Sequence, residues 1–274
     1  MFTVGSEVYC GETDRFEMPV TFGNRELGPV AGYKDTFSLS ISFLADRDAI
    51  AELLPPSLSP GDEGVVTVGY RMVRGAARLR GRGYNIVRVD LESVYEDAQD
   101  VFRAPYAVIM WESSPDSVQT GREYYGVGKL FADIPDLDPA GSEWHFECSE
   151  YGTRLLEANT TDMKAVPPRE LANLDDRGRF ESSYLNWKYI PGLDGRAEVD
   201  YLTTVDSWFE PKEAWVGAGT VHFELPDYQS APVSHRVMVG LETLRPLEYK
   251  GAVATRGPVE IDRTASKTFK SDLS

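Results

Sequence analysis

The sequence predicts a mainly β protein of the α+β type, built from one antiparallel sheet that closes on itself and a few short helices. Two observations support this fold class. About ten to twelve segments have the apolar–polar alternation and the turn-flanked length of strands. These segments follow one another without the regular strand–helix–strand rhythm of a parallel sheet. No linker divides the 274 residues, so we expect one domain.

The first half of the chain begins with residues 1–32, which are rich in Gly, Pro and charge and are predicted to form an irregular arm. Residues 36–43 alternate large apolar side chains with serine, which is typical of a half-buried strand. Asp46 is placed to cap a short helix over residues 48–54, which two prolines end. Further strands are expected over residues 64–73, 84–95 and 106–112.

The second half continues with strands, and the domain is expected to span residues 33–249. Residues 163–179 are rich in Pro and charge and predict a loop or a helical turn. The polar residues 250–274 are expected to form a tail. The predicted strands of this half cover residues 143–150, 152–160, 182–190, 197–209, 214–225 and 233–245.

Residues 120–134 contain the main candidate for a catalytic residue. Thr120 and Glu123 have the spacing of a capping box that begins a helix, and Gly126 and Gly128 are expected to end it within about two turns. Lys129 follows at the start of an apolar run. A lysine buried at such a junction favours the neutral, nucleophilic amine, because burial disfavours the ammonium form. The alternative is a solvated lysine at the end of a strand.

Residues 121–129 read Gly-Arg-Glu, three residues, an apolar residue, Gly and then Lys. This pattern resembles the signature of the acetoacetate decarboxylase-like family, in which the lysine forms a Schiff base with a keto substrate. Residues 43–55, 186–195 and 213–217 are also similar to that family. The resemblance implies a cone-like or barrel-like sheet with Lys129 deep inside, a small keto acid as substrate, no cofactor and a homo-oligomer.

The chain departs from the family pattern around the lysine. Leu130 stands where family members have a second lysine, so activation of Lys129 must depend mainly on burial. Ile86 and Gly69 stand where the resemblance places glutamates, unless the register shifts to Asp90 or Glu92. The arginine that the family carries near its N-terminus maps only to residues 34–36. These departures weaken the prediction of decarboxylation more than the prediction of Schiff-base chemistry in general.

Several residues near the lysine are candidates for the site. Glu112, Glu123 and Tyr84 are candidates for general acid–base catalysis alongside Lys129, although Glu123 could serve only as the capping partner. The candidates for substrate binding, or for positive charge near the amine, are Arg122, Trp111, Met110, Ile86, Leu130 and Lys188. Trp111 and Met110 could instead simply fill the core.

Five arginines lie within residues 71–82, at positions 71, 74, 78, 80 and 82. One interpretation is a collar that attracts a carboxylate substrate, because guanidinium matches carboxylate geometry. The simpler interpretation is a hairpin loop whose charges pair with the acidic surface.

Composition excludes several classes of function. A net charge of −16 and a pI near 4.7 argue against nucleic acid or an anionic membrane as a partner. The N-terminus does not resemble a signal peptide, no apolar run approaches about 18 residues, and the two cysteines form no CxxC, which favours the cytoplasm. His145 and Glu147 share a strand face, but we expect no metal site, because the sequence lacks the usual metal-binding motifs.

The leading functional prediction is a lyase that decarboxylates a β-keto acid through an iminium on Lys129. The first alternative is an aldolase-dehydratase that condenses pyruvate or a related keto acid with an aldehyde. The second is a non-catalytic barrel in which Lys129 only pairs with the carboxylate of a ligand.

Overall fold

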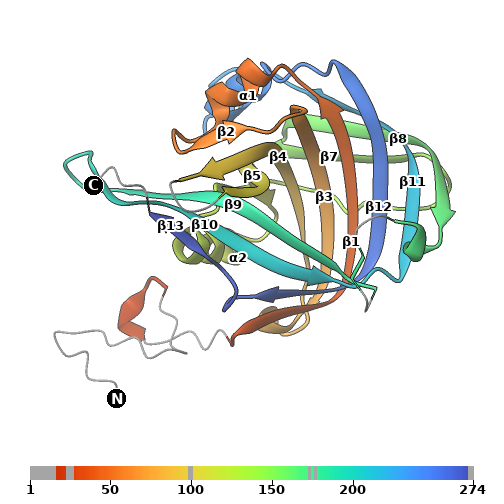
Figure 1. The fold of residues 1–274 in the computed structure, drawn as a ribbon, viewed down its shortest axis with the longest axis horizontal. Coiled ribbons are helices and arrows are strands. Elements are labelled where there is room, and N and C mark those ends of the chain that lie inside the picture. Colours follow the sequence, from red (N-terminus) through yellow and green to blue (C-terminus); the bar gives the residue numbers. More distant parts are fainter. Residues whose placement is uncertain (1–16, 23–27, 98–100, 172–173, 176–177, 271–274) are drawn as a thin grey trace.

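The computed structural model describes residues 17–22, 28–97, 101–171, 174–175 and 178–270. Among these residues, thirteen strands belong to a single sheet, and the three α-helices are short (Figure 1). The helices are α1 (Arg47–Leu53), α2 (Pro115–Thr120) and α3 (His235–Leu241). The strands are β1 (Val30–Leu44), β2 (Leu58–Pro60), β3 (Val65–Ala76), β4 (Tyr84–Glu96), β5 (Val101–Glu112), β6 (Lys129–Phe131), β7 (Trp144–Glu150), β8 (Thr153–Val166), β9 (Phe180–Pro191), β10 (Ala197–Phe209), β11 (Glu213–Phe223), β12 (Glu248–Asp262) and β13 (Thr268–Lys270).

Seven of the strands form a closed ring in the order β12–β1–β3–β4–β5–β9–β10. The ring closes where Asp206–Phe209 of β10 pair with Val259–Asp262 of β12. Most pairs are antiparallel, and β5 pairs in parallel with β6 and with β9. The predicted mainly β fold with an antiparallel sheet closed on itself is therefore confirmed.

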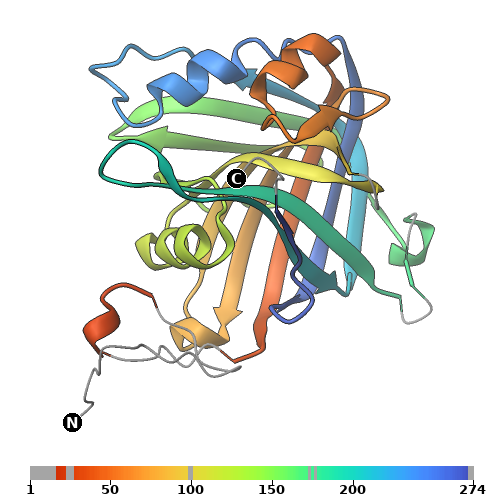
Figure 2. The same cartoon turned by 60° about the vertical axis from the view of Figure 1, so that its left-hand side comes forward.

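Beyond β12 the sheet continues through β11, β8 and β7, which fold back over the outer face of the ring. The main hydrophobic core lies between this extension and the ring. On β1 the apolar residues Phe37, Leu39, Ile41 and Phe43 are at most 1% exposed and face this core, as their alternation with serine predicts. The helices α1 and α3 lie side by side along one rim of the sheet (Figure 2).

The strands of the ring are buried on both faces where they pass under the extension. On β4, Val87, Val89 and Leu91 face the main core. The alternate residues Tyr84 and Ile86 belong to a second hydrophobic cluster inside the ring. Successive residues of a strand point to opposite faces, so each of these strands contributes to both clusters.

Two predictions about the C-terminal part were wrong. Residues 233–245 do not form a strand, because their buried residues Met238, Leu241 and Leu244 recur at the spacing of a helix face and produce α3. Residues from 250 onward do not begin a polar tail. They form most of β12, whose small residues Ala252 and Ala254 are buried between β1 and β11.

Most of the predicted N-terminal arm lies outside the described residues. Of the described residues, 17–22 lie against the segment that leads to Lys129. Residues 30–32 already belong to β1, so the predicted irregular arm ends earlier than residue 32. Glu17 is buried there, and Thr120 donates a hydrogen bond to its carboxylate.

Candidate active site

The helical segment that precedes Lys129 begins earlier than the capping-box pattern suggests. Ser114 accepts from the N–H of Ser117 and caps α2, with Pro115 at the first helical position, where the missing N–H costs nothing. Thr120 is therefore inside the helical segment and makes no capping bond, so the predicted capping box was wrong. The carboxylate of Glu123 accepts from the N–H of Met18 instead.

The end of this segment is where the glycines predict it. A π-helical turn, η3 (Gly121–Tyr125), follows α2 and ends at Gly126, whose φ of 74° is a left-handed conformation that glycine adopts without strain. The chain then enters β6 at Lys129, which pairs with Met110 of β5. The side chain of Lys129 thereby points under α2 and η3.

Lys129 is buried, with 9% of its surface exposed. Its Nζ donates to Oε1 of Glu112 at 2.8 Å and to the carbonyl oxygen of Ser117 at 3.2 Å. Glu112 is 1% exposed, and its Oε2 has no hydrogen-bond partner among the described residues. A Cβ on Gly121 would lie 2.5 Å from Nζ, so only glycine leaves room for the amine at this point of η3.

The amine faces a cavity inside the ring, with about 730 Å³ of space including its opening. Residues from all seven ring strands, from the α2–η3 segment and from β6 line it. They are Ala31, Tyr33, Thr36, Arg71, Val73, Arg78, Tyr84, Ile86, Arg88, Met110, Glu112, Ser117, Thr120, Gly121, Tyr125, Val127, Lys129, Tyr184, Val205, Val259, Ile261 and Arg263.

The strand register arranges these residues in rows across the sheet. Arg71 of β3 pairs with Ile86 of β4, which pairs with Glu112 of β5. The next row contains Arg88, which pairs with Met110 and with Gly69. The pair of Glu112 and Lys129 therefore lies one strand away from Ile86 and two strands away from Arg71.

The cavity contains more positive than negative side chains. Four arginines and Lys129 line it, and Glu112 is the only carboxylate among its lining residues in the described part of the chain. Two of the arginines have carboxylate partners behind the wall: Arg78 pairs with Asp116, and Arg88 pairs with Asp90 at 2.8 Å. In a protein with a net charge of −16, this local excess of positive charge favours an anionic ligand.

Tyr84 is placed to donate a proton rather than to accept one. Burial, followed by the neighbouring Tyr33 hydroxyl and the charge of Glu112, raises the pKa of Tyr84 well above its ordinary value. Its hydroxyl donates to that of Tyr33 at 3.2 Å. At neutral pH the Tyr84 hydroxyl therefore keeps its proton at the cavity wall.

The structure brings together five of the residues that the sequence singles out. Lys129, Glu112, Tyr84, Ile86 and Met110 all line the cavity. Their roles in binding and catalysis stay predictions.

The other candidates lie elsewhere. Arg122 is exposed and donates to the carbonyl oxygen of Lys129 from outside, and Glu123 bonds to Met18. Trp111 and Leu130 point to the opposite face of their strands from Met110 and Lys129, and pack in or against the main core. The indole N–H of Trp111 donates to Ser234 there.

The distant cation Lys188 does not line the cavity either. Its ammonium group donates to the carbonyl oxygen of Tyr124 at 3.1 Å, and burial lowers its pKa.

The positions at which acidic groups were expected carry none that reaches the amine. Asp90 is buried beside Arg88, and burial raises its pKa against the opposing charge of that arginine. Glu92 accepts from the backbone N–H groups of residues 63–65 in a distant loop. At Gly69 the missing side chain leaves space for Arg88, whose Cγ lies 3.5 Å from where a Cβ would be.

Several residues that line the cavity were not predicted from the sequence. Arg88 could have been found from the alternation Tyr84, Ile86, Arg88 along one face of β4. Of the five clustered arginines, Arg71 and Arg78 line the cavity, whereas the others lie outside it. Arg263 carried no local signal, because only closure of the ring brings the C-terminal end of the domain to the site. Thr36 lies within residues 34–36, where the family resemblance placed an arginine, and it reaches the site through the pairing of β1 with β3.

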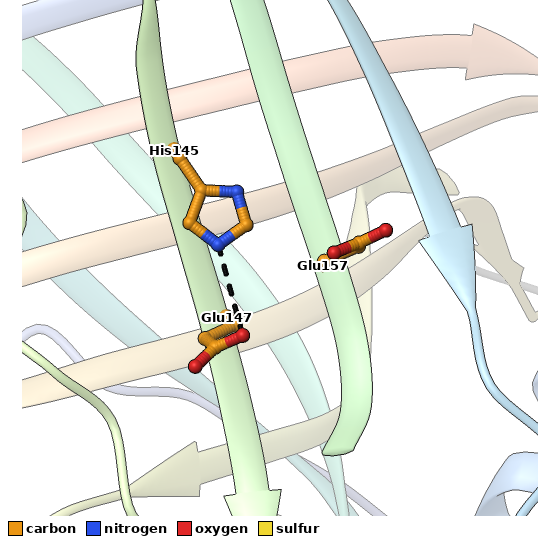
Figure 3. Close-up of side chains that lie close together, drawn as sticks. All are labelled: His145, Glu147 and Glu157. Carbon is orange, nitrogen blue, oxygen red and sulfur yellow. Dashed lines mark ion pairs between the residues drawn. The ribbon is translucent and has the colours of Figure 1, made fainter.

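One group of potential metal ligands lies away from the cavity, on the outer extension. His145 and Glu147 of β7 and Glu157 of β8 point toward one another, with ligand atoms within 4.8 Å (Figure 3). The guanidinium of Arg154 lies 2.8 Å from Glu157 and 4.0 Å from Glu147. A metal ion would have to displace this arginine, so these residues form an ordinary surface network of charges.

No helix in the described part of the chain has the length and apolar character needed to cross a membrane.

Comparisons with known proteins identify the family and the fold. The family model described as acetoacetate decarboxylase (ADC) matches residues 17–257. A solved structure of acetoacetate decarboxylase superposes with a TM-score of 0.74 at 16% identity, covering 95% of this chain and 97% of that chain. Acetoacetate decarboxylase from Legionella pneumophila superposes with a TM-score of 0.71 at 18% identity, covering 99% and 100%.

The enduracididine biosynthesis enzyme MppR, complexed with pyruvate, superposes with a TM-score of 0.65 at 19% identity, covering 90% of this chain and 93% of that chain. No curated protein sequence matches the chain. The structural likenesses show the shared fold, and the match of the family model over most of the chain shows the relationship. The chain belongs to the acetoacetate decarboxylase family.

Proposed function

We propose that this protein is a Schiff-base-forming lyase that acts on a small keto acid through the amine of Lys129. The observation that carries the proposal is the pair formed by Lys129 and Glu112, buried at the wall of a cavity inside the ring. An amine held 2.8 Å from a carboxylate can transfer its proton to that carboxylate and become a nucleophile.

The reaction begins when Glu112 accepts a proton from the ammonium group of Lys129. The neutral amine attacks the carbonyl carbon of the substrate, and the carbonyl oxygen takes up a proton to give a carbinolamine. Glu112 then returns its proton to the hydroxyl group, which leaves as water, and an iminium remains on Lys129. The iminium accepts the electron pair of a bond that breaks next to it, so the reaction needs no organic cofactor.

Two reactions share this intermediate. Loss of carbon dioxide from a β-keto acid was the leading prediction from the sequence, and family membership supports it. Condensation of a keto acid with an aldehyde is the second candidate. It is favoured by the missing acidic groups at Gly69 and Ile86 and by the arginines in the wall, since a positive wall stabilises a carboxylate that stays on the substrate. The solved complex of MppR with pyruvate gives it further support.

Trapping of the imine tests the proposal. The protein is incubated with acetoacetate or with pyruvate, reduced with borohydride and digested, and the modified peptide is identified by mass. We expect the reduced adduct on Lys129, and no adduct in Lys129→Ala or Lys129→Arg. Lys188→Arg is the matched control, because Lys188 is partly buried but lies outside the cavity, and this variant should trap normally.

Absence of an adduct with every keto acid tried would overturn the proposal, as would unchanged turnover by Lys129→Arg. Ligand binding that Lys129→Arg retains, with no turnover by either protein, would fit the non-catalytic binding barrel. Release of carbon dioxide, compared with consumption of pyruvate together with an aldehyde, distinguishes the two reactions. A cytoplasmic location and a homo-oligomeric assembly stay predictions from the sequence and from the family resemblance.

A further inference from the structure

Arg71 is a cation at the wall of the cavity that forms no ion pair with any described residue. Among the described residues, none forms a hydrogen bond or an ion pair with its guanidinium group. The two neighbouring guanidinium groups differ in this respect, because Arg78 and Arg88 each have a carboxylate partner. A partly buried charge without a partner is costly unless the site is completed by a ligand.

The surroundings of Arg71 increase the free-energy cost of burying its charge. Burial, and then the charge of Arg88, lower the pKa of Arg71 to about 10, so its charged form is stabilised less than in water. The Nη1 atom of Arg88 is itself buried without a hydrogen-bond partner. Asp90 contacts Arg88 and acts on Arg71 only at longer range, so an anion bound beside Arg71 would be stabilised by both guanidinium groups.

Arg71 lies at a suitable separation from the reactive amine. It occupies the same row of the sheet as Ile86 and Glu112, two strands away from the carboxylate that contacts Lys129. Adjacent strands are about 4.8 Å apart, so the Cα atoms of Arg71 and Glu112 are about 10 Å apart. Both residues line the same cavity, so one small keto acid can contact Arg71 while its ketone lies at the amine beside Glu112.

We propose that Arg71 is the specificity-determining residue of this site: its guanidinium group binds the carboxylate of the keto acid whose ketone reacts with Lys129, and holds that carboxylate through the reaction. This inference rests on the proposed Schiff-base function. It assigns a 2-keto acid as the substrate class, because the carboxylate is then adjacent to the carbon that Lys129 attacks and is kept in the product.

The negative charge of the bound carboxylate indicates which of the two reactions Arg71 would favour. Decarboxylation turns the carboxylate into neutral carbon dioxide, so an arginine bound to it stabilises the ground state more than the transition state. Loss of a proton from the carbon on the other side of the iminium leaves the carboxylate intact. Glu112 accepts that proton, the resulting enamine carbon bonds to the carbonyl carbon of an aldehyde, and the aldehyde oxygen becomes a hydroxyl group by taking up a proton. Water then hydrolyses the iminium, which releases the product and regenerates the amine.

The test compares pyruvate with methyl pyruvate, which has the same ketone but no negative charge. Rates of borohydride-trapped imine formation on Lys129 are measured against concentration for the unmodified protein, Arg71→Met, Arg71→Lys and the control Arg103→Met. Arg103 is a surface arginine paired only with Asp62, so its replacement should change neither substrate. We expect Arg71→Met to raise the half-saturating concentration of pyruvate by about 10- to 100-fold, the usual loss for a charge-assisted hydrogen bond. Methyl pyruvate should be unaffected, and Arg71→Lys should recover part of the loss.

Removal of a cation without a counter-ion should leave the melting temperature unchanged or higher, which separates a binding role from a structural one. If Arg71→Met does not fold, Arg71→Lys and Arg71→Gln are compared in the same way.

An unchanged preference for pyruvate over its ester in these variants would overturn the role of Arg71. No adduct with either compound in the unmodified protein would overturn the proposed function itself. Equal trapping of both compounds by the unmodified protein would overturn only the role of Arg71.

Discussion

Nζ of Lys129 lies 2.8 Å from Oε1 of Glu112, and the other oxygen of this carboxylate has no partner within the described residues. One oxygen can therefore exchange a proton with the amine, and the second is buried beside it. No other carboxylate among the described residues lines the cavity, so proton transfer in the proposed reaction depends on Glu112.

Replacement of Glu112 by glutamine should lower kcat by about 10²- to 10⁴-fold, the usual contribution of a general acid–base group. The amide can still accept the hydrogen bond from Lys129 but cannot take its proton, so the melting temperature should change little. Glu123→Gln is the control, because Glu123 lies outside the cavity, and its kcat should stay close to that of the unmodified protein. A larger loss in Glu123→Gln than in Glu112→Gln would contradict the assignment.

Replacement of Gly121 by alanine should impair the amine without unfolding the protein. The backbone of Gly121 is helical and accepts alanine, but the new Cβ would lie 2.4 Å from Cε and 2.5 Å from Nζ of Lys129. The flexible side chain must move, and a displacement of about 1 Å can cost about 10²-fold in rate. Trapping rates and melting temperatures are compared with those of Gly32→Ala, where a Cβ meets nothing within 4 Å. Normal trapping by Gly121→Ala would show that the position of the amine is not critical.

Replacement of Gly126 by alanine should destabilise the fold. Its φ is 74°, which costs an alanine about 1–2 kcal/mol, and its Cβ would lie 2.2 Å from Cβ and 2.5 Å from Cα of Lys188. We expect a total loss of more than about 2 kcal/mol in the free energy of unfolding, measured with urea. Gly195→Ala isolates the backbone contribution, because φ is 82° there but nothing lies within 4 Å. Equal losses in the two variants would mean that contact with Lys188 is unimportant.

The ion pair of Asp35 and Arg256 should give a small stabilisation that disappears in acid. The hydrogen bond from Arg256 lowers the pKa of Asp35, with its Nη2 2.7 Å from the carboxylate. Both side chains are more than a third exposed, so the contribution is only about 0.5 kcal/mol.

The unfolded chain binds more protons than the folded protein in this range. The stabilisation is therefore complete above the ordinary aspartate pKa of about 3.9 and is lost as the pH falls through the lower folded value. We expect Asp35→Asn to melt slightly below the unmodified protein at pH 6 and together with it near pH 2. A difference in melting temperature that persists at pH 2 would contradict this origin.

Much of the fold could be predicted because its signals are local. The alternation of Phe37, Leu39 and Ile41 with serine specifies β1 and its buried face, since a strand with one apolar face has only one favourable orientation. Gly126 ends the helical segment because few other residues adopt its φ. The segment over residues 233–245 was misjudged because a short apolar run does not distinguish a strand from a helix.

The sequence by itself determined that Lys129 follows a broken helix at the start of a buried strand and that Glu112 and Tyr84 end or begin neighbouring strands. It could not determine that Glu112 contacts the amine, that Trp111 points away from it, or that Arg71 lines the same cavity without an ion-pair partner among the described residues. These relationships depend on which face of each strand turns inward and on closure between β10 and β12, which joins residues distant in the chain. Only the tertiary structure decides them, because a shift of one residue in register reverses the face of every side chain in a strand.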